Sequence, residues 1–129
     1  MVPRSELVTV PENSTPEQVE RVVARTGYSR FPVAAEDGEF VGYLHLKDLL
    51  YAEAEQYDRP IPQARVRTLA SVASTDEVED ALAVMQRAGS HLARVVGEDG
   101  VTAGLIFLED VLEQLVGEVI DASQREGAD

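Results

Sequence analysis

The sequence repeats itself after 62 residues, and this internal repeat constrains the fold more than any other feature. Residues 26–50 align without a gap on residues 88–112. Over the wider span 7–50, 14 of 44 residues are identical to the residue 62 positions later, against about 3 expected by chance. Several identities are glycines or charged residues at fixed offsets, such as Gly42 with Gly104 and Asp48 with Asp110. The chain therefore consists of two copies of one structural pattern.

Each copy shows the same order of helix and strand signals. Residues 13–27 read NSTPEQVERVVARTG, in which Ser14 or Thr15 can cap a helix, Pro16 suits its first turn and Gly27 suits a left-handed end. Residues 31–35 predict a strand, 36–39 a turn, 40–46 a second strand and 46–57 a second helix. The second copy predicts the same elements, and short strands are expected near 7–10 and 69–72.

The predicted fold class is therefore α/β, or more strictly α+β, with two β-α-β-β-α motifs. A copy of about 60 residues is too small to bury a good core alone, so the two should pack about a pseudo-twofold axis and leave clefts between them. The expected division is residues 1–57 for the first motif, 58–65 for a proline-bearing linker, 66–121 for the second motif and 122–129 for a polar tail.

Composition excludes several classes of protein. The chain has no cysteine, so it has neither disulfides nor thiolate metal sites. Its net charge of −13 argues against nucleic acid as a partner, because phosphate contacts need clustered Lys and Arg. No apolar run approaches the length of a membrane span, and no nucleophile–base motif or phosphate-binding loop is present. The chain is therefore expected not to be an enzyme.

Tandem β-α-β-β-α copies of this kind resemble a pair of CBS domains, also called a Bateman module. The stretches that carry a closer resemblance are VPRSELVTV, GYSRFPV, GYLHLKDLL and HLARVVGEDGVTAGLIFLEDVLEQLVGEV. They are similar to the CBS pair of the CorC/CNNM group, which is associated with magnesium and cobalt transport and was formerly described as hemolysin-like. The resemblance implies the cytosolic portion of a membrane protein, attached to a transmembrane domain, and a homodimer formed through the CBS helices.

The resemblance also implies an adenine-nucleotide site with the signature Gly-h-h-Thr/Ser-x-x-Asp, where h is apolar. Asp110 takes the aspartate position of the second copy and Asp48 that of the first, where each would accept hydrogen bonds from ribose hydroxyls. The Thr/Ser position holds His45 in one copy and Phe107 in the other, so this chain departs from the pattern. An alternative is that both aspartates only stabilise helix N-termini.

Arg30 is the candidate phosphate contact, because its guanidinium can bind phosphate with two hydrogen bonds. The better site is predicted to combine this arginine with Asp110, and the neighbouring residues expected there are Tyr28, Ser29, Phe107 and Ser5. A second, weaker cleft would contain Asp48, His45 and His91. The alternative for Arg30 is an ion pair with one of the many carboxylates.

Two functions follow from these residues. The first is a regulatory module that senses ATP or AMP, with or without Mg²⁺, and has no other cofactor or metal site. The second is a structural dimerisation module without a ligand, which Phe107 favours because it replaces a hydroxyl with bulk.

Overall fold

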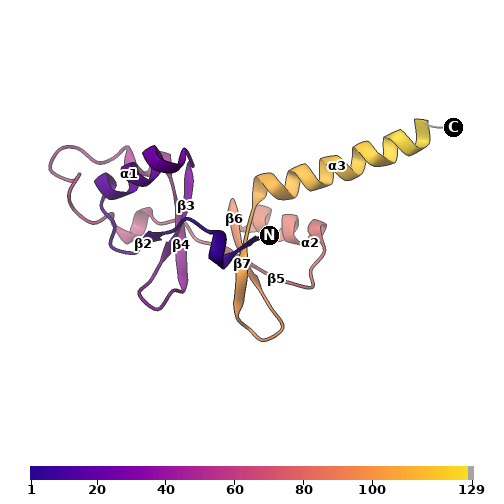
Figure 1. The fold of residues 1–129 in the computed structure, drawn as a ribbon, viewed down its shortest axis with the longest axis horizontal. Coiled ribbons are helices and arrows are strands. Elements are labelled where there is room, and N and C mark those ends of the chain that lie inside the picture. The colour runs from indigo at the N-terminus through magenta and orange to yellow at the C-terminus, as the bar shows by residue number, and fades with distance from the viewer. Residues whose placement is uncertain (128–129) are drawn as a thin grey trace. The chain divides into compact units, whose positions relative to one another are not determined.

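A computed structural model describes the backbone of residues 1–127 and the side chains of residues 1–121. The chain forms two compact units, each with its own sheet (Figure 1). Residues 7–68 make up the first-copy unit. Residues 1–6 together with the chain from residue 69 onward make up the second-copy unit.

The first-copy unit has a three-stranded sheet of order β2-β3-β4, with one α-helix and two short 3₁₀ helices. Strand β2 is parallel to β3, and β3 is antiparallel to β4. Its elements are β2 (Val10–Pro11), α1 (Pro16–Thr26), β3 (Arg30–Ala34), β4 (Phe40–His45), η2 (Leu46–Leu49) and η3 (Gln63–Arg65).

The second-copy unit has a four-stranded sheet of order β1-β7-β6-β5. Its elements are β1 (Val2–Pro3), η1 (Arg4–Glu6), β5 (Ala70–Ala73), α2 (Val78–Ala88), β6 (Leu92–Val96), β7 (Thr102–Phe107) and α3 (Leu108–Gly127). The extra strand β1 comes from the start of the chain and runs antiparallel to β7, so the first six residues complete the sheet of the second copy.

The sequence repeat is reproduced in the element bounds. Adding 62 to the bounds of α1, β3 and β4 gives those of α2, β6 and β7. The hairpin registers also correspond, because Val33 pairs with Gly42 as Val95 pairs with Gly104, and the same irregularity follows each pair. The mixed α and β architecture, with two separate sheets, confirms the predicted fold class; the pseudo-twofold packing of the copies stays a prediction.

The predicted helix signals of α1 are confirmed. The Thr15 hydroxyl accepts a hydrogen bond from the Gln18 N–H at 3.2 Å, and the Gln18 side-chain oxygen accepts one from the Thr15 N–H at 2.9 Å. These two bonds form a capping box, which satisfies amide groups that a helix start leaves without partners. Gly27 ends the helix with φ of 72°, a left-handed conformation that glycine adopts without strain.

The predicted second helix of the first copy is wrong. Residues 46–49 form only the 3₁₀ helix η2, and turns follow, whereas the corresponding α3 of the second copy begins at Leu108 and continues for 20 residues. Residues 52–56 read AEAEQ and offer no large apolar side chain, while Leu115 of α3 packs against the second-copy core. Helices of this length depend on burying an apolar face, so good helix propensity alone did not suffice here.

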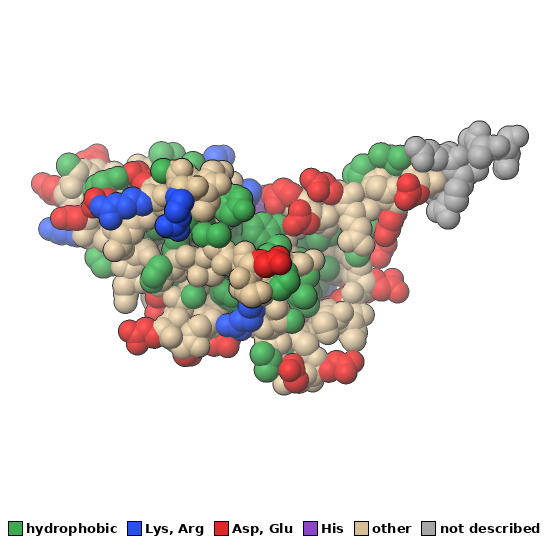
Figure 2. Space-filling model, in the orientation of Figure 1, with side chains coloured by type: hydrophobic (Ala, Val, Ile, Leu, Met, Phe, Trp, Pro, Cys, Tyr) green, Lys and Arg blue, Asp and Glu red, His purple; other side chains and the backbone are tan. Residues whose placement is uncertain are grey.

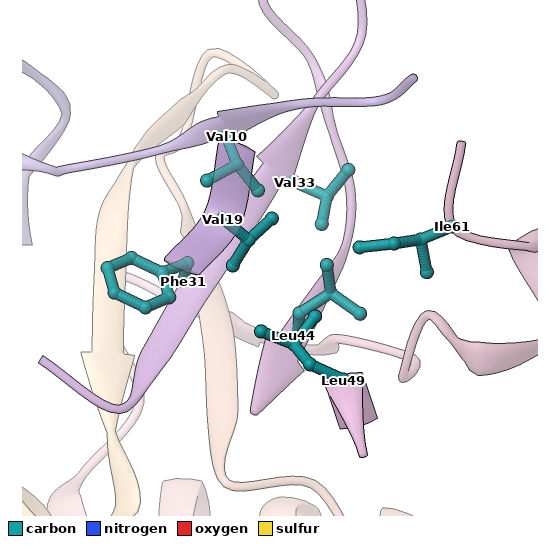
Figure 3. Close-up of a cluster of buried hydrophobic side chains, with 7 residues drawn as sticks. All are labelled: Val10, Val19, Phe31, Val33, Leu44, Leu49 and Ile61. Carbon is teal, nitrogen blue, oxygen red and sulfur yellow. The ribbon is translucent and has the colours of Figure 1, made fainter. Parts of the chain in front are cut away.

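Each unit has its own hydrophobic core. The first-copy core is a cluster of seven buried side chains: Val10, Val19, Phe31, Val33, Leu44, Leu49 and Ile61 (Figure 3). The second-copy core contains the buried residues Ala70, Val72, Ala81, Met85, Ala93, Val95 and Val111. Smaller residues occupy three positions of the second core, where Ala81, Ala93 and Val111 correspond to Val19, Phe31 and Leu49 of the first.

Candidate functional site

A cavity of about 300 Å³ opens in the second-copy unit between sheet and helices. Its walls come from β5 and the following turn, from α2, from β6 and β7, and from the first turns of α3. The lining residues are Met1, Val72, Ala73, Ser74, Asp76, Val78, Ala81, Val95, Ile106, Asp110, Val111 and Gln114. Apolar walls with a few polar groups, in a space of this size, are typical of a small-molecule site.

Asp110 supplies an exposed carboxylate on the wall of this cavity. It lies in the first turn of α3, where the helix dipole favours a negative charge. Its side chain forms no ion pair or hydrogen bond with any residue whose side chain is described. Asp110 can therefore accept hydrogen bonds from a ligand without first breaking an internal bond.

The second acidic group of the cavity, Asp76, already accepts a hydrogen bond from the backbone. Its carboxylate accepts a hydrogen bond from the Ala73 N–H at 2.9 Å and so stabilises the turn between β5 and α2. This turn brings Ala73, Ser74 and Asp76 to the cavity wall. Sequence analysis did not predict these residues, although the polar stretch STDE between strand and helix was a signal for a turn at this place.

Phe107 occupies the Thr/Ser position of the expected signature, but its neighbour Ile106 lines the cavity instead. Phe107 ends β7, is half-buried and pairs in register with Leu92 of β6. Ser5, another predicted residue, is exposed in η1 and does not line the cavity. A ligand contact by either residue stays a prediction.

The equivalent aspartate of the first copy is in a different state. Asp48 forms an ion pair with Arg67, in which the guanidinium Nη2 lies 2.7 Å from one carboxylate oxygen and Nε lies 2.9 Å from the other. The Asp48 carboxylate also accepts a hydrogen bond from the His45 N–H at 2.8 Å. Its side chain is only 11% exposed, so the first-copy aspartate is enclosed and satisfied within its own unit.

These contacts shift two pKa values. Burial alone would raise the pKa of Asp48, but the hydrogen bonds from Arg67 and from the His45 backbone, with the charge of Arg67, together lower it. Burial lowers the pKa of His45, and the positive charges of Arg30 and Arg67 lower it further. The His45 Nδ1 accepts a hydrogen bond from the Lys47 N–H at 3.0 Å, which requires that nitrogen to be unprotonated.

Replacing Arg67 with alanine should lower the free energy of unfolding by up to about 1 kcal/mol at pH 7, because the guanidinium is partly exposed to water. The pKa of Asp48 is lower in the folded chain than the usual value of about 4, so the pair contributes fully above that pH. The contribution is lost as the pH falls through the folded pKa, and parent and variant should converge near pH 2 in urea titrations. Arg21→Ala, which removes a more exposed ion pair with Glu17, is the control and should change stability by about 0.5 kcal/mol or less. An equal gap between parent and Arg67→Ala at pH 2 and pH 7 would contradict this.

The predicted phosphate contacts lie in the first-copy unit. Arg30 begins β3, is half-buried, and pairs in register with His45 of β4. Tyr28 and Ser29 form the connection between α1 and β3, and 57% of the Tyr28 side chain is exposed. These three consecutive residues thus lie at the end of α1 and the start of β3. Their contact with a ligand stays a prediction.

His91, predicted for the weaker cleft, belongs to the second-copy unit. Its Nδ1 lies 3.4 Å from a Glu109 carboxylate oxygen, and its backbone carbonyl accepts a hydrogen bond from the Leu108 N–H at 2.8 Å. The residues of the predicted weaker cleft are thus divided, with Asp48 and His45 in the other unit. Among the side chains described, no three His, Cys, Asp or Glu residues gather as ligands for a metal ion.

Comparison with known proteins identifies the architecture. Residues 1–55 and 65–117 both match the family model of the CBS domain. The protein is therefore a member of the CBS domain family and carries a tandem pair of CBS domains.

Similar proteins indicate which group of CBS-domain proteins the chain resembles. Over 132 aligned positions, the chain is 36% identical to the magnesium and cobalt efflux protein CorC of Escherichia coli K12, covering 98% of this chain and 44% of CorC. It is 45% identical over 107 residues to an uncharacterized protein of Mycobacterium tuberculosis, covering 83% of this chain and 31% of that protein. A solved CBS domain of a bacterial CNNM/CorC family Mg²⁺ transporter, in complex with ATP, superimposes with a TM-score of 0.81 at 34% identity, covering 91% of this chain and 84% of that one.

The chain is thus homologous to the CBS pair of the CNNM/CorC family, as the sequence motifs predicted. A hemolysin-like CBS protein of Oenococcus oeni is also similar in structure, with a TM-score of 0.78 and 28% identity over 88% of this chain and 84% of that one. The chain spans less than half the length of the curated relatives described above. Within residues 1–127, no helix combines the length and the apolar character needed to cross a membrane.

Proposed function

We propose that this CBS pair is the regulatory module of a CNNM/CorC-like ion transporter, on the cytosolic side of the membrane, and binds ATP or AMP in the cavity of the second-copy unit. The observation that carries the proposal is the Asp110 carboxylate, which has no internal partner among the described side chains and lines an apolar cavity. The relative solved in complex with ATP supports the choice of an adenine nucleotide.

The cavity offers both contacts that an adenine nucleoside requires. The side chains of Val72, Ile106 and Val111 give apolar surface for the flat base. The Asp110 carboxylate can accept hydrogen bonds from the two ribose hydroxyls, and such charge-assisted bonds are stronger than neutral ones.

The phosphates of a nucleotide need positive charge nearby, and this chain has only 11 Lys and Arg residues against 24 Asp and Glu residues. Two carboxylates, Asp76 and Asp110, line the cavity, and the whole chain carries a net charge of −13. Mg²⁺ bound to the phosphates would reduce this repulsion. Binding would regulate the attached membrane domain by favouring one conformation of the module over another.

Replacing Asp110 with asparagine should weaken ATP binding by roughly 10- to 100-fold, because a charge-assisted hydrogen bond contributes about 1.5–3 kcal/mol. Isothermal titration calorimetry with ATP and Mg²⁺ measures the change. The matched control is Asp48→Asn, which alters the equivalent aspartate and should leave the affinity unchanged, because Arg67 already occupies that carboxylate.

A second variant tests the cavity itself. Ala81→Val gives the second copy the residue that the first copy has at this position, Val19, and should fill part of the cavity. It should weaken ATP binding while leaving the fold intact. If Asp110→Asn and Ala81→Val both bind ATP as tightly as the parent, the nucleotide does not bind in this cavity.

The alternative function, structural dimerisation, is favoured by one surface. Large apolar side chains are exposed along α3 at a helical spacing, and hydrophobic side chains are visible there in Figure 2. They are Leu112, Val116, Val119 and Ile120. An exposed apolar stripe of this kind is a typical contact surface between proteins, and we propose that it pairs two copies of the chain.

Light scattering of the parent should give twice the mass of one chain, which is 14.1 kDa. Val116→Glu places a charge in the middle of the stripe and should shift the protein to monomer at tens of micromolar concentration. Val101→Glu, equally exposed but in the turn between β6 and β7, should leave the mass unchanged. A parent mass of one chain at this concentration argues against the dimer.

A further inference from the structure

We propose that residues 61–67, which comprise the end of the predicted linker and the two residues after it, act as an internal ligand of the first copy and close a latent binding site equivalent to the cavity of the second copy. The inference rests on the proposed function, because it assigns the same ligand class, an adenine nucleotide, to the closed site. It accounts for the filled cluster of the first copy and the open cavity of the second.

The repeat identifies the positions to compare. Five of the apolar residues that line the second-copy cavity have counterparts 62 residues earlier that are buried in one cluster. The counterparts are Val10, Val19, Val33, Leu44 and Leu49. The sixth aliphatic member of this cluster is Ile61, which comes from the linker and not from the repeated elements (Figure 3).

Ile61 fills the space that is open in the second copy. Its side chain is 6% exposed and extends toward Leu44 and Val33 (Figure 3). Its backbone N–H donates a hydrogen bond to the Ser14 carbonyl oxygen at 2.9 Å. Ser14 corresponds in the repeat to Asp76, which lines the second-copy cavity. The linker therefore makes both an apolar and a polar contact at positions equivalent to the cavity wall.

Arg67 binds the aspartate at the polar end of the equivalent first-copy site. Its guanidinium gives two hydrogen-bond donors to the two carboxylate oxygens of Asp48, at 2.7 and 2.9 Å. Two adjacent ribose hydroxyls would present the same pattern of two donors to a carboxylate. Asp48 corresponds to Asp110. The Arg67 guanidinium therefore donates to Asp48 the two hydrogen bonds that we propose the ribose hydroxyls donate to Asp110.

The linker backbone is held in place between these two side chains. Arg67 and Tyr43 exchange two backbone hydrogen bonds, at 2.9 and 2.8 Å, which adds a short bridge to the edge of β4. Because the linker is covalently attached, it competes with any free ligand at a high effective concentration. The first-copy site therefore stays closed while the linker is bound.

The test opens the first site in a chain whose second site is weakened roughly 10- to 100-fold by Asp110→Asn. Ile61→Ala with Arg67→Ala then removes both side chains of the internal ligand. Titration of this triple variant with AMP should restore binding, and adding Asp48→Asn should then weaken it at least about 10-fold. Asp110→Asn with Arg65→Ala is the matched control, because Arg65 is a linker arginine that lies over the Tyr51 ring and not on Asp48, and it should bind no AMP at the first site.

A measurement without nucleotide separates this inference from the proposed function. Ile61→Ala should create an apolar cavity that binds benzene, seen as NMR shifts of the Leu44 and Val33 methyl groups that the parent does not show. If the triple variant is folded by circular dichroism, yet neither AMP binding nor benzene shifts occur, the inference is overturned. If the parent binds no nucleotide but the benzene shifts occur, the proposed function fails while the filled first site is supported. Should Ile61→Ala not fold, Ile61→Val with Arg67→Ala in the Asp110→Asn background is titrated with AMP alone, because the loss of one methyl group leaves too little space for benzene; absence of AMP binding by this folded variant then overturns the inference.

Discussion

Phe31→Ala should lower the free energy of unfolding by about 3–5 kcal/mol, the usual loss when a buried phenylalanine is truncated. Phe31 is fully buried in the first-copy core, among side chains from β2, α1, β3 and β4 (Figure 3). The loss combines the removal of apolar area from the core with the cavity left behind. Urea unfolding followed by circular dichroism measures it as a shift of the midpoint at unchanged slope.

The matched control is Val41→Ala on the neighbouring strand β4, whose side chain is 43% exposed. This change should shift stability by about 0.5 kcal/mol or less, as surface substitutions usually do. A loss of less than about 1 kcal/mol for Phe31→Ala would mean that the first-copy core is not packed as described.

Gly42→Ala should lower the free energy of unfolding by about 3 kcal/mol, at the upper end of the range for overpacking. A methyl group at this position would lie 2.4 Å from the Arg67 carbonyl oxygen and 2.6 Å from Val66 Cγ1. The first of these atoms belongs to the backbone, so the linker would have to move away from β4. The change should therefore also lengthen the Arg67–Asp48 ion pair, which NMR titration would detect as a higher pKa of Asp48.

Gly117→Ala is the control for this glycine series. Gly117 lies within α3, and an added methyl group there meets no atom within 4 Å. Alanine should stabilise the helix by up to about 1 kcal/mol, because glycine is the poorer helix former. If Gly42→Ala were as stable as the parent, the close approach of the linker to β4 would be wrong.

Much of the fold was predictable because its signals are local. The bounds of α1, β3 and β4 follow from a capping box, a glycine end and short apolar runs, and the repeat gives their counterparts in the second copy. The predicted second helix of the first copy failed because residues 52–56 lack large apolar side chains, which local propensity does not weigh.

The candidate site was predictable only in part. The signature aspartates were found because they stand at a fixed distance from Gly42 and Gly104. The sequence did not predict that Asp48 is paired while Asp110 is unpaired within the described part of the chain, because the Arg67–Asp48 ion pair joins residues 19 positions apart across an irregular linker. Ile61 gave no signal of its own, since one isoleucine between two prolines does not reveal which core it enters.

The two copies differ in the space beside the signature aspartate and in the partners of that aspartate. The second copy has Ala81 where the first has Val19, and its cavity lies open beside a carboxylate with no internal partner among the described side chains. The first copy is filled by Ile61 and its aspartate is held by Arg67. Repetition therefore produced two similar scaffolds, of which we propose one binds a ligand.

The most direct test is NMR of the uniformly ¹⁵N-labelled parent, titrated with ATP in the presence of Mg²⁺. We predict saturable amide shifts in the second copy at residues 72–78 and 106–114, around the cavity and the start of α3. The equivalent first-copy residues 10–16 and 44–52 should shift much less. Shifts concentrated in those first-copy segments, or none in either copy at millimolar ATP, would contradict the assignment of nucleotide binding to the second copy.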